Sequence, residues 1–163
     1  MAIDPLLLSV LLLVGVANGS PILAKKFLNN RFDMPLDGGR RLRDGQPVFG
    51  PSKTIRGLVV SVCSTTFVAL LLGFEWTIGT VVAAGAMAGD LASSFVKRRL
   101  RLKSQAQAVG LDQIPEALLP LLLLKSRLGL SGAEIAGLVT AFVVLVLVLS
   151  RFLFRAGIRD RPY

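Results

Sequence analysis

Long uncharged apolar segments constrain this chain more than any other feature. The segments 5–24, 57–74 and 135–150 contain no Asp, Glu, Lys or Arg, and 76–96 contains Asp90 as its single charge. About 20 apolar residues cross the hydrocarbon core of a bilayer as a helix, and only helices and closed barrels satisfy the backbone polar groups there. A mean hydropathy of +0.66 agrees with this interpretation. The sequence therefore predicts an all-α integral membrane protein.

The apolar segments predict about five transmembrane helices in a single membrane domain, 1–163. The first could instead be a signal peptide. Signal peptides carry Lys or Arg before the apolar run, whereas only Asp4 precedes this one, so we favour a retained helix. The fourth is interrupted by Pro115 and Pro120, so we expect it to be kinked. The expected helices are 5–24, 57–74, 76–96, 106–124 and 131–151, with loops 25–56 and 97–105 on one side of the membrane.

Positive charge is concentrated in three parts of the chain. Of the 19 Lys and Arg residues, all but Lys125 and Arg127 lie in loops 25–56 and 97–105 or in the tail that begins at Arg151. The positive-inside rule predicts a multi-pass protein of the cell membrane with its N-terminus outside and its C-terminus cytoplasmic. The polar site would then face the cytoplasm. A net charge of +9 can indicate nucleic acid binding. Membrane topology explains this charge directly, so we expect no nucleic acid partner.

The titratable residues limit the possible chemistry. The chain has no His and one cysteine, Cys63, which excludes a Ser–His triad, an internal disulfide and a thiol metal cluster. A carboxylate inside a membrane helix costs about 2.5–3.5 kcal/mol, so Asp90 is a functional candidate. Asp90, Ser94 and Lys97 recur at helical spacing and share a face.

Acids and cations together suggest phosphate chemistry. Paired carboxylates such as Asp90 and Asp112 commonly hold Mg²⁺ with substrate phosphates. A phosphate nucleophile is already ionised and needs no His base, so nucleotidyl transfer fits this composition better than hydrolysis. From charge alone, an alternative stays open in which the cations only determine topology.

Short stretches along the chain resemble one family of membrane enzymes. The signature of the membrane CTP-dependent cytidylyltransferases, the CDP-diacylglycerol and CDP-archaeol synthases, is similar to Gly89-Asp90, Ser94-x-x-Lys97-Arg98 and Leu111-Asp112-Gln113. The small archaeal-type branch has further stretches similar to Ala17-Asn18-Gly19-Ser20-Pro21, Asp37-Gly38-Gly39-Arg40-Arg41, Asp44-Gly45 and Ser52-Lys53-Thr54-Ile55-Arg56-Gly57. The resemblance covers residues 15–125 in matching order.

This resemblance implies an enzyme that joins CTP to a membrane lipid phosphate and releases pyrophosphate. The lipid would be phosphatidate or an isoprenoid glycerol-ether phosphate, and the product a CDP-activated lipid for phospholipid synthesis. The implied cofactor is Mg²⁺, the partners are CTP and the lipid phosphate, and a homodimer is left open. The implied catalytic residues are Asp90, Asp112, Lys97 and Lys53, and the implied metal ligands are Asp90, Asp112 and Glu116. The implied substrate-binding residues are Asn18, Arg40, Arg41, Asp44, Thr54, Arg56, Ser94, Arg98 and Gln113.

The chain departs from the family pattern at two points. Pro51-Ser52 takes the place of an acidic residue, and Pro115 replaces a second acid three residues after Asp112. Glu116 is the candidate to substitute for that acid. Two alternatives to the cytidylyltransferase remain: a relative that uses another nucleotide or a polyprenyl phosphate, and a non-catalytic membrane binding or transport protein. Mg²⁺-dependent consumption of CTP would separate the first interpretation from the others.

Overall fold

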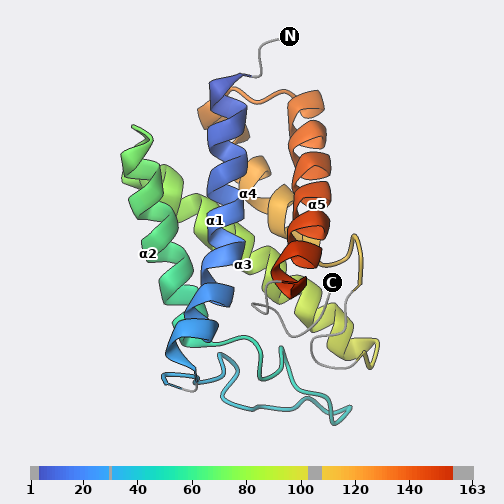
Figure 1. Cartoon of the computed structure of the whole chain (residues 1–163). Coiled ribbons are helices and arrows are strands. Elements are labelled where there is room, and N and C mark those ends of the chain that lie inside the picture. Colours follow the sequence, from blue (N-terminus) through green and yellow to red (C-terminus); the bar gives the residue numbers. More distant parts are fainter. Residues whose placement is uncertain (1–3, 30, 103–107, 156–163) are drawn as a thin grey trace.

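The computed structural model describes residues 4–29, 31–102 and 108–155. These residues form an all-helical bundle (Figure 1). Three of its helices carry apolar spans long enough to cross a membrane: Pro5–Leu28, Trp76–Arg99 and, within the last helix, Gly132–Phe152. The prediction of an all-α fold is confirmed. The helices are α1 Pro5–Leu28, α2 Ile55–Leu71, α3 Trp76–Arg99, α4 Gln113–Leu128 and α5 Gly132–Arg155.

Three helices continue past their apolar segments, and one of them, α5, runs through Arg151 to Arg155. α1 runs through Pro21 to Leu28 with Lys25 and Lys26 in its last turn, and α3 runs to Arg99. Cations are favourable at a helix C-terminus because they face the negative end of the helix dipole. Residues 97–99 are therefore helical, which corrects the predicted loop 97–105, and its residues 103–105 lie outside the described part of the chain.

α4 begins and ends later than the predicted helix 106–124, of which 106 and 107 lie outside the described residues. Gly110 adopts a φ of +86°, so the chain turns shortly before the helix. Pro115 is tolerated because it lies in the first turn, where backbone N–H groups have no intrahelical acceptor. At the other end, Gly129 takes a left-handed φ of +65°, and the Leu130 N–H donates to the Lys125 carbonyl at 3.0 Å.

Glycines on α3 let the neighbouring helices approach its backbone. A Cβ on Gly85 would lie 2.8 Å from the Pro120 Cα, and a Cβ on Gly89 would lie 2.7 Å from the Glu116 nitrogen. Gly79 meets α2 in the same way, since a Cβ there would lie 2.6 Å from the Thr66 Cα. Small residues are common where membrane helices pack closely. This contact holds the polar start of α4 against the last turns of α3.

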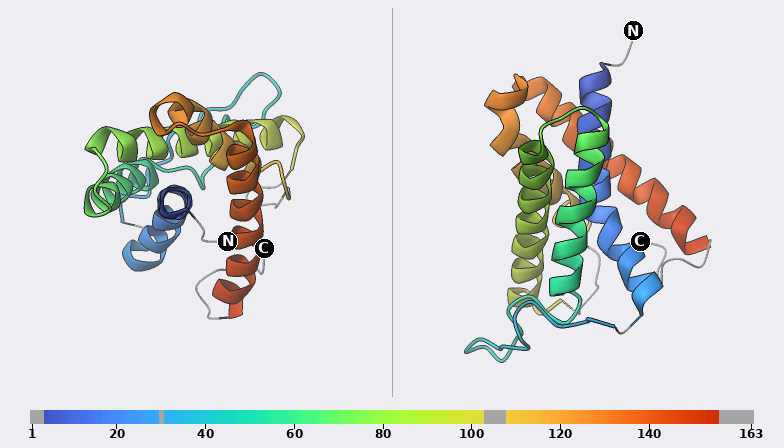
Figure 2. Two further views of the ribbon diagram at one scale, coloured as in Figure 1. Left: turned by 90° about the horizontal axis from the view of Figure 1, so that it is seen from above. Right: turned by 90° about the vertical axis from the view of Figure 1, so that its left-hand side faces the viewer.

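The arrangement collects the polar segments at one end of the bundle. The loop between α1 and α2 and the end of α3 lie at the end opposite the α4–α5 connection, and the start of α4 packs against α3 at Gly89 (Figure 1). α5 crosses the bundle obliquely, and α1 lies in the angle between α5 and the row formed by α2 and α3 (Figure 2). The apolar core between them includes Leu13, Val14, Val82 and Phe142.

Candidate active site

Asp90 lies at the centre of a charged cluster where α3 meets α4. The close contact at Gly89 sets the Asp90 carboxylate beside that of Glu116, which lies within hydrogen-bonding reach of it. Lys53 and Asp112 are near enough for their charges to act on Glu116. Glu116 on α4 therefore lies beside Asp90 on α3. Because the two residues are on different helices, their spacing in the sequence does not predict this proximity.

Lys53 reaches this cluster from the loop between α1 and α2. Its Nζ donates to both Asp90 oxygens, at 2.6 Å to Oδ1 and 2.5 Å to Oδ2. The Leu36 N–H donates to the Lys53 carbonyl at 2.7 Å, which fixes the backbone from which the side chain extends. The Lys53 and Asp90 side chains are 22% and 20% exposed, so water screens their attraction less than that of a surface pair.

A second Lys–Asp pair ties the end of α3 to the start of α4. The Lys97 Nζ lies 2.6 Å from the Asp112 Oδ1, and the side chains are 10% and 17% exposed. The Asp112 Oδ2 also accepts from the Ala108 N–H at 3.1 Å. The predicted catalytic residues Lys53, Lys97, Asp90 and Asp112 thus occupy one end of the bundle as two ion pairs.

Other predicted residues are buried close by on the same two helices. Ser94 and Arg98 are 3% and 5% exposed on α3. Gln113, at the start of α4, accepts from the Gly110 N–H at 2.8 Å. Lys97 and Arg98 are charged residues in a protein interior, an uncommon position unless they are paired or functional.

Several predicted substrate-binding residues instead contact the protein itself. Arg56 is buried, and its guanidinium donates to the Asn29 carbonyl at 2.8 Å, to the Arg31 carbonyl at 2.5 Å and to the Asp33 Oδ1 at 3.0 Å. Thr54 caps α2 by accepting from the Gly57 N–H at 3.1 Å. These contacts give both residues a structural role, and their substrate contacts stay a prediction.

The other four predicted substrate-binding residues make their described contacts outside the cluster. Asn18 donates to the Val14 carbonyl at 3.0 Å, one turn back along α1. Arg41 donates to the Gly45 carbonyl at 2.8 Å, and Arg40 is exposed on the same loop. Asp44 accepts from Arg99. None of these side chains has a described contact with Lys53 or Asp90 in the part of the chain covered by the structure.

Asp37 and Arg99 are two organising residues that the sequence patterns do not place at the site. Asp37 organises the loop, because its carboxylate accepts from the N–H groups of Gly39, Phe49 and Gly50. Burial acts to raise the pKa of Asp37, but these N–H donors outweigh it and hold the pKa below its ordinary value. The Asp-Gly-Gly stretch signals such a turn, whereas no local signal identifies the partner of Arg99.

The carboxylates fit a magnesium ion in part. Mg²⁺ is commonly bound through one or two carboxylates together with substrate phosphates. Asp90 and Glu116 provide such a pair. Within the described ranges, no group of three acidic, His or Cys side chains is placed to hold a metal ion. Asp90, Glu116 and Asp112 therefore stay predicted ligands.

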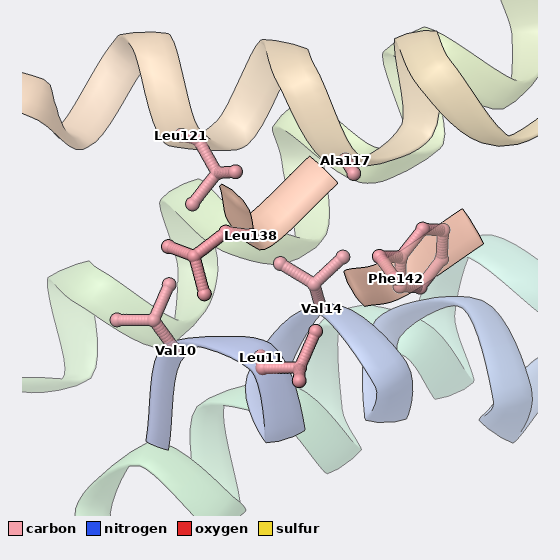
Figure 3. Close-up of a pocket in the computed structure, with 7 residues that line it drawn as sticks. All are labelled: Val10, Leu11, Val14, Ala117, Leu121, Leu138 and Phe142. Atoms are coloured by element: carbon pink, nitrogen blue, oxygen red, sulfur yellow. The ribbon is translucent and has the colours of Figure 1, made fainter. Parts of the chain in front are cut away.

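An apolar pocket lies between α1, α4 and α5 (Figure 3). It is lined by Val10, Leu11, Val14, Ala117, Leu121, Leu138 and Phe142. Because every lining side chain is apolar, the pocket provides no group that could bind a nucleotide phosphate. The charged cluster is therefore the candidate site.

The fold and the cluster together define a class of protein. Membrane-length helices that gather carboxylates and cations into one cluster fit a membrane enzyme that acts on phosphates, and such chemistry does not need His. Comparison with known proteins then identifies the family. A family model described as CarS-like, CDP-archaeol synthase, matches residues 3–163, and the chain belongs to this family.

Individual relatives agree with the family model. The CDP-archaeol synthase of Hyperthermus butylicus is 39% identical over 104 residues, which is 60% of this chain and 59% of that protein. The chain is thus aligned with about three-fifths of that relative's length. The CDP-archaeol synthase of Thermofilum pendens is 33% identical over 154 residues, covering 91% of this chain and 76% of that protein.

A solved structure supports the fold as well. It is described as an intramembrane enzyme for archaeal membrane lipids biosynthesis and matches with a TM-score of 0.75 and 29% identity. The match covers 86% of this chain and 90% of that chain. The protein is therefore a multi-pass membrane protein. The predicted resemblance to the archaeal branch of the cytidylyltransferases is confirmed, and with it the prediction of a nucleotidyltransferase of phospholipid biosynthesis, at the level of the family.

Proposed function

We propose that this protein transfers a cytidylyl group from CTP to the phosphate of an archaeal ether lipid, giving a CDP-activated lipid and pyrophosphate. One observation carries the proposal. In a member of the CDP-archaeol synthase family, the cations Lys53 and Lys97 and the acids Asp90, Glu116 and Asp112 lie together at one end of a membrane bundle. A lipid headgroup and a soluble nucleotide can meet only at such a boundary between membrane and water.

The reaction needs positioning and charge stabilisation more than proton transfer. A lipid phosphate oxygen attacks the α-phosphorus of CTP, the bond from that phosphorus to the bridging oxygen breaks, and pyrophosphate leaves with the electron pair. The attacking oxygen is already ionised near neutral pH, so a chain without His can support the step. Lys and Arg side chains stabilise charge on transferring phosphoryl groups. Lys53 and Lys97 are placed to do so.

Mg²⁺ is the proposed cofactor. Asp90 and Glu116 would hold it, with Asp112 as a further proposed ligand. When bound, the ion neutralises negative charge on the phosphate oxygens. Through the bound ion, the two acids would fix the position of the triphosphate relative to α3 and α4. Lys53 would contribute from the loop side and Lys97 from the end of α3.

We also propose the topology predicted by the charge distribution. The chain forms a single membrane domain, α2 and α4 cross the membrane with the three longer helices, the N-terminus is outside, and the site faces the cytoplasm. Labelling of single cysteines introduced at positions 38–45 should occur only from the cytoplasmic side, and at positions 128–130 only from outside. External labelling of 38–45 would contradict this topology. A homodimer stays a prediction, tested by the mass of the protein–detergent particle.

One assay tests the proposed activity directly. Purified protein in detergent is incubated with Mg²⁺, each of the four nucleoside triphosphates, and either a geranylgeranyl ether glycerol phosphate or phosphatidate. We expect pyrophosphate release and a CDP-lipid, by mass spectrometry, with CTP and the ether lipid. The absence of a nucleotidyl-lipid in every pairing would refute the proposed function.

A further inference from the structure

The loop between α1 and α2 contains a folded segment, residues 37–50. The Asp37 carboxylate accepts from Gly39 at 3.0 Å, from Phe49 at 2.9 Å and from Gly50 at 3.0 Å. Further along, the Val48 N–H donates to the Arg40 carbonyl at 3.1 Å. These bonds join both ends of the segment. The segment can therefore be held or released as one unit.

Arg99 fastens this segment to the end of α3. Its Nη1 donates to both oxygens of Asp44, at 2.9 and 2.8 Å, and its Nη2 donates to the Pro47 carbonyl at 2.6 Å. The ring of Phe95, one turn earlier on α3, lies 5.1 Å from the guanidinium carbon. A cation over an aromatic face is favourable, and Phe95 also restricts the arginine to this position. Arg99 thus contacts three loop residues, Asp44, Pro47 and, at 3.5 Å, the Gln46 carbonyl, and one residue of its own helix.

The segment and the charged cluster share the same two chain elements. Lys53, which pairs with Asp90, follows the segment by three residues, while Arg99 stands on the same helix as Asp90. The loop is therefore attached to α3 at two points. One attachment lies within the proposed active site, and the other lies outside it. The outer attachment limits how far the backbone that carries Lys53 can move.

We propose that Arg99 and Asp44 form a clamp that positions Lys53 over Asp90. The inference rests on the proposed function, because it assigns both residues a role in cytidylyl transfer. Arg99 is a positioning residue that acts through the loop and touches neither substrate. Asp44 accordingly serves Arg99 and not the substrate, which differs from the role implied by the family resemblance.

Steady-state kinetics of the full-length protein test the clamp. Arg99→Ala and Asp44→Ala should each lower kcat/KM for CTP on the order of 10-fold or more, because a displacement near 1 Å can cost about 100-fold. KM for the ether lipid phosphate should change little. The double variant should be no slower than the slower single variant, because the residues act as a unit. Arg99→Lys, which can reach Asp44 but cannot also span to Pro47, should recover part of the loss.

Arg43→Ala is the matched control. Arg43 is an exposed cation beside Asp44, and its replacement should leave kcat and KM at their wild-type values. Losses that multiply in the Arg99→Ala/Asp44→Ala double variant would overturn the clamp, because they would show that Asp44 acts independently. Equal weakening of CTP and lipid use with a lowered thermal midpoint would also overturn it, by showing general destabilisation.

Hydrogen–deuterium exchange gives a readout that does not depend on activity. In the full chain in detergent, residues 37–50 should exchange faster in Arg99→Ala and Asp44→Ala than in the wild type or Arg43→Ala. Unchanged exchange would overturn the clamp whatever the kinetics. If the wild type forms no CDP-lipid, the proposed function fails, while faster exchange would still support the attachment of the loop by Arg99.

Discussion

Asp90→Asn should abolish most of the activity by removing one charge at the centre of the site. The Asp90 carboxylate accepts from Lys53 through both oxygens and lies beside Glu116. With side chains only 20% and 22% exposed, the pair is partly shielded from water, and hydrogen bonds to charged groups are worth about 1.5–3 kcal/mol. The amide would also weaken the binding of any cation that residue 90 holds together with Glu116. We expect turnover to fall at least ~100-fold, about 2.7 kcal/mol in barrier.

The assay compares initial rates of pyrophosphate release from CTP and the ether lipid phosphate. Glu75→Gln is the control, since Glu75 is an exposed carboxylate at the opposite end of α3. Gel filtration and helix content by circular dichroism should show that both variants are folded. Wild-type turnover and Mg²⁺ dependence in Asp90→Asn would refute the assignment of this cluster as the active site.

Three further predictions test the elements that support the cluster. Gly89→Ala should lower stability by about 1–3 kcal/mol through overpacking and reduce turnover, because the added Cβ would lie 2.7 Å from the Glu116 nitrogen. Gly15→Ala is the control and should have little effect, because a Cβ on Gly15 would meet no atom within 4 Å. Arg56→Ala should lower the thermal midpoint by leaving the Asn29 and Arg31 carbonyls without their donor, and a raised KM for CTP at unchanged stability would show phosphate binding instead. The pKa of Asp37 is lowered from 3.8 in the folded protein. Asp37 therefore stabilises the loop fully above the unfolded-state pKa, and this stabilisation is lost as the pH falls through the folded-state pKa. Proteolysis within 37–50 should increase only in that acidic range, and Asp37→Asn should remove the pH dependence.

The sequence predicts the helices well because their signal is local. Apolar segments of about 20 residues are long enough to cross a bilayer as helices, so the positions of α1, α3 and α5 follow from where these segments lie in the sequence. Their ends do not, since Lys25, Lys26 and Arg99 extend helices into polar sequence. Hydropathy alone cannot distinguish a charged last turn from a loop.

The candidate site is predictable in part for a related reason. Asp90 is recognisable because a carboxylate in an apolar helix is costly. The partners of the cations are not recognisable, because they lie far away in the sequence: Lys53 is 37 residues from Asp90, Arg56 is 23 from Asp33, and Arg99 is 55 from Asp44. In the sequence, a basic residue that binds a substrate phosphate cannot be distinguished from one that pairs with a loop carboxylate. Only the fold shows which partner lies beside it.

The departure at Pro115 is explained by the contact between α3 and α4. Pro115 lies in the first turn of α4, where the missing N–H costs no helical hydrogen bond. The backbone at this point packs against Gly89, which leaves no room for a Cβ between the two helices. The same contact brings the next residue, Glu116, to Asp90. Glu116, the residue after Pro115, therefore places a second carboxylate beside Asp90 although position 115 itself carries no acid.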